Sequence, residues 1–251
     1  MRLATSAALL LACAATPAAA QQLAYAIEER EDSPAGAEGP RLHYALLDRL
    51  EYASQRGEDG YAWDFSALYG GDTNRLWLSI VGEGPTWGDP DYVEVQALYG
   101  RDAGGGWDVN AGLRYDVVPR PRRLYLTVGG QLTKEWTDSD FWLGAFTYVS
   151  HEGELSARVG GIYNRRLSGR FFLQPSLELN ASAQDVPELT LGRGLTYAEL
   201  GLRLRYQLRD AFAPYAGISW ERSLGRTARM ERAEGDDPET TSLVLGVRSD
   251  F

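Results

Sequence analysis

The stretch WDVNAGLRYDVV, residues 107–118, alternates between two classes of side chain along most of its length. One set of alternate positions is apolar: Trp107, Val109, Ala111, Leu113, Tyr115 and Val117. The other set is polar or small: Asp108, Asn110, Gly112, Arg114 and Asp116. Alternate residues of a β-strand point to opposite faces, whereas a helix would spread each set around its circumference. The stretch therefore predicts a strand with one apolar and one charged face.

The same period of two recurs in FFLQPSLELNASAQ (171–184), ELGLRLRYQLR (199–209) and TTSLVLGVRSDF (240–251). A soluble β-sandwich also alternates, but its polar face meets bulk water. Here the polar faces mix charges of both signs with glycines, as expected for a narrow lumen, and lipid-facing and lumen-facing residues alternate in outer-membrane barrels. We therefore predict an all-β fold, a transmembrane antiparallel β-barrel with a polar, charged lumen, and keep the sandwich as the alternative.

Segments with this period predict about twelve strands, with ten as the alternative. They cover 41–54, 60–69, 74–83, 91–101, 107–117, 122–133, 140–150, 153–166, 170–184, 195–208, 212–223 and 240–251. An even number is typical of bacterial barrels. With both chain ends in the periplasm, the long connections at 83–91, 185–194 and 224–239 face outward, and short turns such as 70–74 face the periplasm. Long outer loops and short periplasmic turns are the barrel pattern.

Residues 1–20 have the features of a signal peptide. Arg2 gives a positive start, an apolar run follows, and Ala18, Ala19 and Ala20 form a small-residue cleavage site. A lipobox ending at Cys13 is the alternative. Residues 21–40 are acidic and have no strand period, so we expect a disordered N-terminal segment. These features predict three regions, 1–20, 21–40 and the barrel at 41–251, and a protein of the bacterial outer membrane with a cleaved signal peptide.

Charge and composition limit the partners. After residue 20 the chain has no run of eighteen apolar residues, so no helix is expected to cross a membrane. The net charge of -10 argues against nucleic acid and attracts cations. Cleavage after residue 20 removes the single cysteine and with it any disulfide or thiolate metal site. We expect a monomer in contact with outer-membrane lipid.

The scarcity of histidine argues against an enzyme. His43 and His151 are the two histidines, and the strand order places them at opposite ends of the barrel. The sequence has no G-x-S-x-G elbow, and a hydrolase needs a nucleophile and an oriented base. An outer-membrane lipid hydrolase stays an alternative, which predicts His151 beside a serine at the membrane's outer edge. A small general porin is a second alternative.

Charged residues on the polar faces are the candidates for function. Those expected to point inward or to sit at the mouths are Asp48, Arg49, Glu51, Asp72, Arg75, Glu83, Arg114, Asp116, Glu178, Glu199, Arg203, Arg205 and Glu221. One interpretation is a network of arginine–carboxylate pairs that fills a closed lumen. The other is a lumen in which carboxylates locally exceed arginines and which binds or conducts cations.

Seven stretches, taken in order, resemble the copper resistance protein B family of Gram-negative bacteria. They are LLDRLEY (46–52), GGDTNRLWL (70–78), VEVQALYGR (93–101), WDVNAGLRYD (107–116), LQPSLELNASAQD (173–185), GLRLRY (201–206) and AFAPYAGISWERSLGRTA (211–228). The resemblance covers nearly all of 42–251. It implies an outer-membrane barrel of copper homeostasis, with copper as the bound metal and a periplasmic multicopper oxidase as a partner. The barrel would act by copper binding, by cation passage or as a scaffold for that partner.

The sequence departs from this family at its soft copper ligands. Many members carry a Met- and His-rich segment before the barrel, suited to Cu(I). Residues 21–40 contain neither Met nor His, and Met230 is the one methionine after the signal. Four carboxylate positions match the family pattern, as does Arg75: Asp48, Glu51, Asp72 and Glu83. With the histidines and the methionine, the metal-ligand candidates are His43, His151, Met230, Asp48, Glu51, Asp72 and Glu83.

Overall fold

The computed structural model of the chain describes residues 42–251. The predicted signal peptide, 1–20, and the predicted N-terminal segment, 21–40, lie outside the described residues. The division of the chain into three regions therefore stays a prediction.

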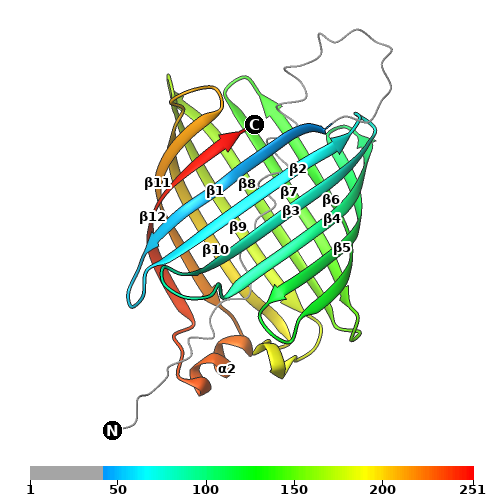
Figure 1. Cartoon of the computed structure of the whole chain (residues 1–251), viewed down its shortest axis with the longest axis vertical. Helices are drawn as coiled ribbons and strands as arrows, with labels where there is room; N and C mark the ends of the chain where they lie inside the picture. Colours follow the sequence, from blue (N-terminus) through cyan, green and yellow to red (C-terminus); the bar gives the residue numbers. More distant parts are fainter. Residues whose placement is uncertain (1–41) are drawn as a thin grey trace.

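The described residues form twelve β-strands and two short helices (Figure 1). The strands are β1 (Leu42–Ser54), β2 (Gly60–Gly70), β3 (Asn74–Pro85), β4 (Tyr92–Gly104), β5 (Trp107–Val118), β6 (Arg123–Trp136), β7 (Ser139–Ser150), β8 (Leu155–Ser168), β9 (Phe171–Ser182), β10 (Gly194–Tyr206), β11 (Phe212–Ser223) and β12 (Glu239–Asp250). The helices are the 3₁₀ turn η1 (Pro187–Leu189) and α2 (Thr227–Glu234). The prediction of twelve strands is confirmed, and the alternative of ten is wrong. No described helix has the length and hydropathy needed to span a bilayer.

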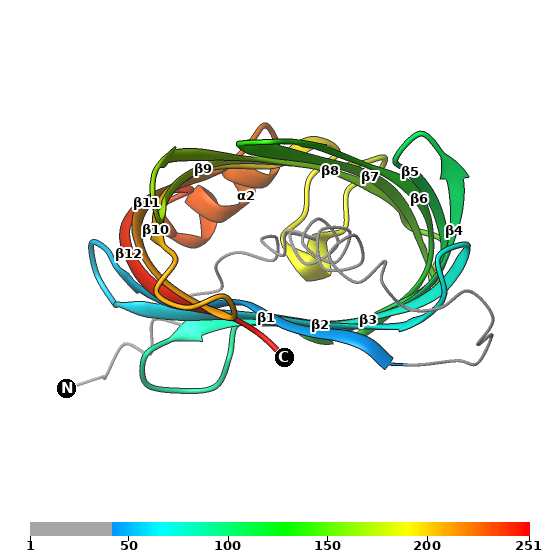
Figure 2. The ribbon, with the colours of Figure 1, turned by 90° about the horizontal axis from the view of Figure 1, so that it is seen from above.

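The strands close into one antiparallel barrel. Each strand pairs with its neighbours in sequence, and β1 pairs with β12, for example Tyr52 with Leu245. No described strand therefore presents an unpaired edge, which is the condition for a sheet in lipid, where nothing else satisfies backbone N–H and C=O groups. Viewed along its axis the barrel is oval, with β1, β2 and β3 on one long side and β7, β8 and β9 on the other (Figure 2).

The alternation in the sequence decides which side chains face lipid. On β12, Leu243 and Leu245 are 64% and 61% exposed on the outer surface, while the alternate residues Ser242 and Val244 are buried inside. On β5, Leu113 is exposed and Arg114 is buried. This is the lipid-out, polar-in pattern of a transmembrane barrel. The predicted fold class is confirmed.

The lumen also contains apolar and aromatic side chains that the sequence analysis did not place there. A cluster of buried residues comprises Tyr44, Leu46, Leu68, Trp77, Leu98, Tyr125, Trp142, Phe146, Tyr148 and Ile162. Trp142 is fully buried, and its ring lies over Gly144, where an added Cβ would come within 2.4 Å of it. The glycines of the inner face thus provide room for rings to lie flat against the barrel wall.

A β-bulge in β1 changes the inner face of that strand. The pairing of β1 with both β2 and β12 shifts register after Leu47. Asp48 and Arg49, although adjacent in sequence, are consequently both on the lumen side, and Arg49 is buried. A bulge inserts one extra residue and interrupts the strict alternation of faces.

The two ends of the barrel differ in their connections. The loop end carries 55–59, 86–91, 119–122, 151–154, 183–193 and 224–238, and the turn end carries 71–73, 105–106, 137–138, 169–170 and 207–211. The sequence analysis predicted this division into long loops and short turns, but it treated 224–239 as a loop without a helix, where α2 forms. Both helices lie at the loop end (Figure 1), within the outline of the barrel seen along its axis (Figure 2).

Candidate functional site

Carboxylates predominate in the half of the lumen next to the loop end. We define the acidic layer as the charged side chains that face inward from the first six residues of each strand, counted from that end. Its eight carboxylates are Glu51, Asp64, Glu83, Glu94, Asp116, Glu178, Glu199 and Glu221. Its four arginines are Arg49, Arg114, Arg123 and Arg158. The twofold excess of carboxylates makes this layer attractive to cations.

Arg158 on β8 connects opposite sides of the acidic layer. Its Nη2 lies 3.1 Å from Glu94 Oε2 on β4, and its Nε lies 3.5 Å from Glu178 Oε1 on β9. Glu94 also forms an ion pair with Arg114, whose Nε lies 2.8 Å from Glu94 Oε2. Arg114 in addition donates two hydrogen bonds to the Asp116 carboxylate, at 2.7 and 2.9 Å. Charge-assisted pairs of this kind are the strong ones. The pairing holds β4, β5, β8 and β9 together through the lumen.

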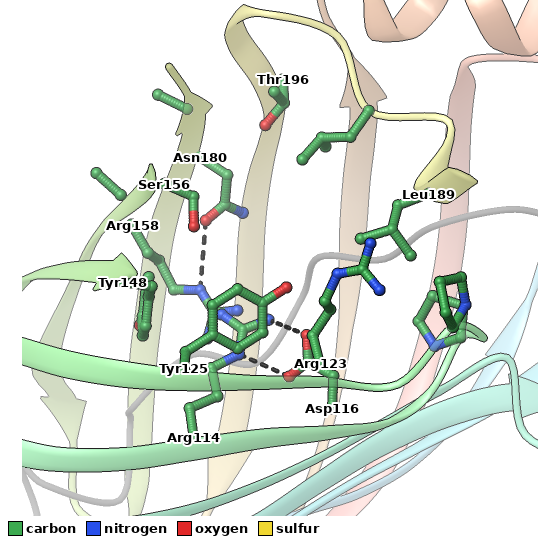
Figure 3. A pocket seen from close by; sticks show the side chains of 15 residues that line it. Arg114, Asp116, Arg123, Tyr125, Tyr148, Ser156, Arg158, Asn180, Leu189 and Thr196 are labelled. Carbon is green, nitrogen blue, oxygen red and sulfur yellow. Dashed lines mark hydrogen bonds and ion pairs between the residues drawn. The ribbon is translucent and has the colours of Figure 1, made fainter. Parts of the chain in front are cut away.

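A cavity of about 60 Å³ lies beside this network. Figure 3 shows Arg114, Arg158 and Tyr148 on its wall, with Leu189 of the η1 turn on the side toward the loop end. The guanidinium carbon of Arg114 lies 4.7 Å from the Tyr148 ring centre, which is cation–π distance. Because the arginines here are bound to carboxylates, the cavity wall has little free positive charge.

The other side of the acidic layer contains carboxylates with fewer partners. Arg49 lies in the field of Glu51, Glu199, Asp64 and Glu83. Ser219 Oγ is 3.3 Å from one oxygen of Glu199 and 3.3 Å from one of Glu221. Hydrogen bonding is incomplete in this region. Both oxygens of buried Asp64 and one oxygen of Glu199 have no hydrogen-bond partner among the described residues. Such groups are costly to bury and mark a place where a cation or water is needed.

Charges in the half nearer the turn end are nearly balanced. The arginines are Arg75, Arg166, Arg203, Arg205 and Arg248, and the carboxylates are Asp48, Asp102, Asp108, Glu135, Asp140 and Asp250. Arg248 contacts Asp48 at 3.3 Å and Asp250 at 2.8 Å. Arg203 forms a fork on Glu51 of the acidic layer, with distances of 2.8 and 3.1 Å, although 152 positions separate the two residues.

The predicted metal ligands are not gathered at one place. Glu51 and Glu83 both lie in the acidic layer near Arg49, and Asp48 lies at mid-height, paired with Arg248. Asp72 is exposed in a short connection of the turn end. Within residues 42–251, no group of three or more His, Cys, Asp and Glu side chains has an arrangement that could hold a metal ion.

The histidines and the methionine are also apart. His43 is in β1 at the turn end, and His151 is in the 151–154 loop at the opposite end. His151 Nδ1 accepts a hydrogen bond from the Leu124 N–H at 3.3 Å, and its Nε2 lies 3.4 Å from Glu152. Ser150 Oγ accepts from the N–H groups of Glu152 and Glu154, so the contacts of this loop do not form a serine–histidine pair. Met230 is half-buried on α2.

Several lumen residues were not singled out from the sequence, among them Asp64, Glu94, Arg123 and Arg158. Each lies on the polar face of its strand, so strand alternation alone would have found them. Which arginine meets which carboxylate has no such signal, because the partners come from distant strands.

The loops at the loop end bind to one another. Gly192 N–H donates to Thr227 Oγ1 at 2.9 Å, and Arg226 lies 2.7 Å from Asp185. An added Cβ on Gly192 would come within 2.4 Å of Arg226 Cβ and 2.5 Å of the Thr227 nitrogen. The segment 183–193 therefore packs tightly against the start of α2, and together they cover part of the barrel opening.

Two carboxyl groups of these loops have pKa values shifted in opposite directions. Burial raises the pKa of Asp91 to about 6, and the nearby Glu58 adds to the shift. Burial alone would also raise the pKa of Glu154, but hydrogen bonds from Arg123 and Ser150 hold it below its ordinary value. Arg123 forms a fork on Glu154, with its Nε 2.9 Å and its Nη2 3.0 Å from the carboxylate oxygens.

Solved structures resemble this fold. The NanC porin has a TM-score of 0.54 at 16% sequence identity, covering 82% of this chain and 98% of that one. The KdgM porin has a TM-score of 0.50 at 12% identity, covering 82% and 99%. At these identities the likeness concerns the fold alone.

Sequence relatives are closer. Copper resistance protein B of Escherichia coli is 38% identical over 206 residues, which are 82% of this chain and 68% of that protein. The Copper resistance protein B homolog of Pseudomonas syringae pv. tomato (strain ATCC BAA-871 / DC3000) is 37% identical over 207 residues, with the same coverage. The family model described as Copper resistance protein B precursor matches residues 41–251. The chain belongs to the copper resistance protein B family.

Proposed function

We propose that this protein is an outer-membrane barrel that takes part in copper resistance by drawing copper ions into the acidic layer. The observation that carries the proposal is the twofold excess of inward carboxylates over arginines near the loop end. Carboxylate oxygens suit divalent copper better than Cu(I), which prefers thioether and thiolate ligands. The proposal agrees with the names of the relatives and with the signal peptide predicted for residues 1–20.

Copper is cargo in this proposal rather than a resident cofactor. Carboxylates with unpartnered oxygens among the described residues, such as Asp64 and Glu199, are the places where we expect a cation to bind. Glu83 and Glu221 place two further carboxyl groups close by. A periplasmic multicopper oxidase that contacts the turn end is the partner to which the family points. A general porin and a lipid hydrolase are not favoured by the family membership.

The test removes charge without changing shape. The triple variant Glu83→Gln, Glu199→Gln, Glu221→Gln leaves Arg49 with less compensation and removes three carboxyl groups. We expect cells with this variant to tolerate less copper than cells with the unmodified barrel at equal outer-membrane levels. We also expect the refolded variant to bind Cu(II) at least about tenfold more weakly, which corresponds to about 1.4 kcal/mol. The matched control is Asp72→Asn, which removes one exposed carboxylate at the turn end.

A second variant tests the other candidate ligands. If His43→Ala, His151→Ala, Met230→Ala abolishes saturable copper binding while the triple glutamine variant retains it, the site is formed by imidazole and thioether and the acidic layer is not the binding region. Equal loss of tolerance to all divalent metals would instead indicate a general cation pore. Unchanged copper tolerance and Cu(II) affinity in the glutamine variant would contradict the proposal.

A further inference from the structure

Arg205 on β10 is a buried cation with incomplete hydrogen bonding among the described residues. Its side chain is 6% exposed, and its Nε and Nη1 have no hydrogen-bond partner in residues 42–251. Its one close contact with a ring is to Phe172, 5.3 Å from the guanidinium carbon. Two buried guanidinium nitrogens without an acceptor are costly, so this group needs one.

The nearest carboxylates are already bound elsewhere. Asp48 and Asp250 are the partners of Arg248. Asp140 accepts a hydrogen bond from Asn164 at 2.7 Å. All three lie in the field of Arg205, but none is within ion-pair distance of it. The protein therefore balances the charge of Arg205 only from a distance.

Arg205 lines a lumen cavity of about 20 Å³ whose wall is rich in arginine. The wall contains four arginines and one carboxylate, together with two neutral polar side chains and a tyrosine: Arg49, Arg203, Arg205, Arg248, Asp48, Gln174, Ser176 and Tyr215. This volume accommodates one water-sized or slightly larger particle. Arg203 and Arg248 already contact carboxylates, and Arg49 lies in the field of several. Water would give Arg205 a hydrogen-bond acceptor without a charge partner, whereas a small anion would supply both.

We propose that the cavity bounded by Arg205, Arg203, Arg248 and Gln174 is a binding site for a small inorganic anion of the size of chloride. Arg205 supplies the unpaired donors, and Arg203 and Arg248 supply charge from guanidinium groups that their own carboxylates hold in position. None of Glu83, Glu199 and Glu221 lines this site, although Arg49 belongs to both its wall and the acidic layer. Its effect is to place negative charge beside Arg205.

The test uses bromide as the probe. Crystals of the unmodified barrel in sodium bromide are expected to show an anomalous peak at hydrogen-bond distance from Arg205. In solution, exchange of sodium gluconate for sodium bromide at constant ionic strength is expected to raise Tm by about 2–4 °C. Arg205→Gln is expected to abolish this rise. Arg75→Gln, whose arginine pairs with Asp108 outside the cavity, is expected to retain it.

Water in the cavity without a bromide peak would overturn the proposal. A bromide-dependent rise in Tm that persists in Arg205→Gln would overturn it as well, because the anion would then bind elsewhere. Since the crystallographic measurement uses the unmodified protein, the decision does not depend on the folding of a variant. Loss of copper binding in the glutamine triple variant has no bearing on this outcome.

Discussion

The two halves of the lumen are formed by the same twelve strands and present the same apolar surface to lipid, yet their interiors differ in charge. Near the loop end, eight carboxylates face four arginines; nearer the turn end, six carboxylates face five arginines. The requirement of a lipid-facing surface acts on every second residue and leaves the others free. The charge of the lumen can therefore vary without a change of fold, and here it differs between the two halves of the barrel.

The difference also appears in how single arginines are used. Arg158 in the acidic layer joins Glu94 and Glu178, and Arg248 in the other half joins Asp48 and Asp250. These two residues have the same local role, a guanidinium between two carboxylates. They differ in what surrounds them, since the neighbourhood of Arg158 is rich in acid.

The largest expected effect comes from Arg158→Ala. It leaves Glu94 and Glu178 buried with one compensating arginine fewer, and we expect a loss of about 3–5 kcal/mol in the free energy of unfolding. Arg248→Ala should cost less, about 1–3 kcal/mol, because Asp250 is partly exposed and Arg205 lies in the same field. Urea unfolding of both refolded variants in lipid vesicles measures the difference.

A surface pair provides the control for this comparison. Arg222 and Glu239 are 3.3 Å apart, but both side chains are more than 40% exposed. Arg222→Ala should therefore change the unfolding free energy by less than about 1 kcal/mol. If Arg158→Ala and Arg248→Ala were equally destabilising, the idea that the acid excess distinguishes the two halves would be wrong.

A smaller effect is expected at the covering loops, which exist at the loop end only. Gly192→Ala places a Cβ against the backbone of Thr227, so the segment 183–193 must move away from α2. We expect the loop contact to weaken by about 1–3 kcal/mol while the barrel stays closed. Trypsin cleavage at Arg193 and Arg226 in intact cells, measured as a rate, should increase about tenfold or more.

The turn end supplies the matched control for the loop variant. Gly71 has nothing within 4 Å of an added Cβ, so Gly71→Ala should leave the cleavage rate unchanged. Cleavage of Gly192→Ala at the rate of the unmodified protein would show that the loops are not held by this contact. In that case the asymmetry between the two ends would be one of length alone.

Strand positions and faces were predictable because they depend on a period that each residue repeats. The alternation in 107–118 and 240–251 predicted both the strands and the residues that contact lipid. Pairings through the lumen were not predictable: Glu51 meets Arg203 across the barrel closure, and Glu94 meets Arg158 across 64 positions. Such partners depend on shear and barrel shape, which no local pattern encodes.

Local exceptions to the period were also not predictable. Asp48 and Arg49 are neighbours that strict alternation would place on opposite faces, and the bulge in β1 places both inside. The helix α2 forms in a stretch that the sequence analysis treated only as a long connection; Gly235 ends it in the left-handed conformation, with φ of 100°. At the candidate site, the sequence therefore predicted the residue types that line the lumen but not their partners.

The smallest expected effect distinguishes two carboxyl groups of the loop end by pH. Because burial raises the folded-state pKa of Asp91 to about 6, the folded protein binds more protons there than the unfolded chain between about pH 4 and pH 6. Stability from this group therefore falls as pH rises through that window. Asp91→Asn should therefore raise Tm at pH 7.5. The gain in the free energy of unfolding should be less than about 1 kcal/mol, because Asp91 is partly exposed, and it should vanish near pH 4.

Glu154 is expected to have the opposite effect on the pH dependence of stability, so it serves as the control. Its pKa is lowered in the folded state by Arg123 and Ser150, so its stabilisation is present above the unfolded pKa and disappears as pH falls through the folded value. Glu154→Gln should lower Tm at pH 7.5, and this loss should diminish in acid. Thermal unfolding of both variants from pH 3.5 to 8 separates the two. Curves of the same slope would mean that acid at the loop end acts through total charge, and not through the separate surroundings of each carboxylate.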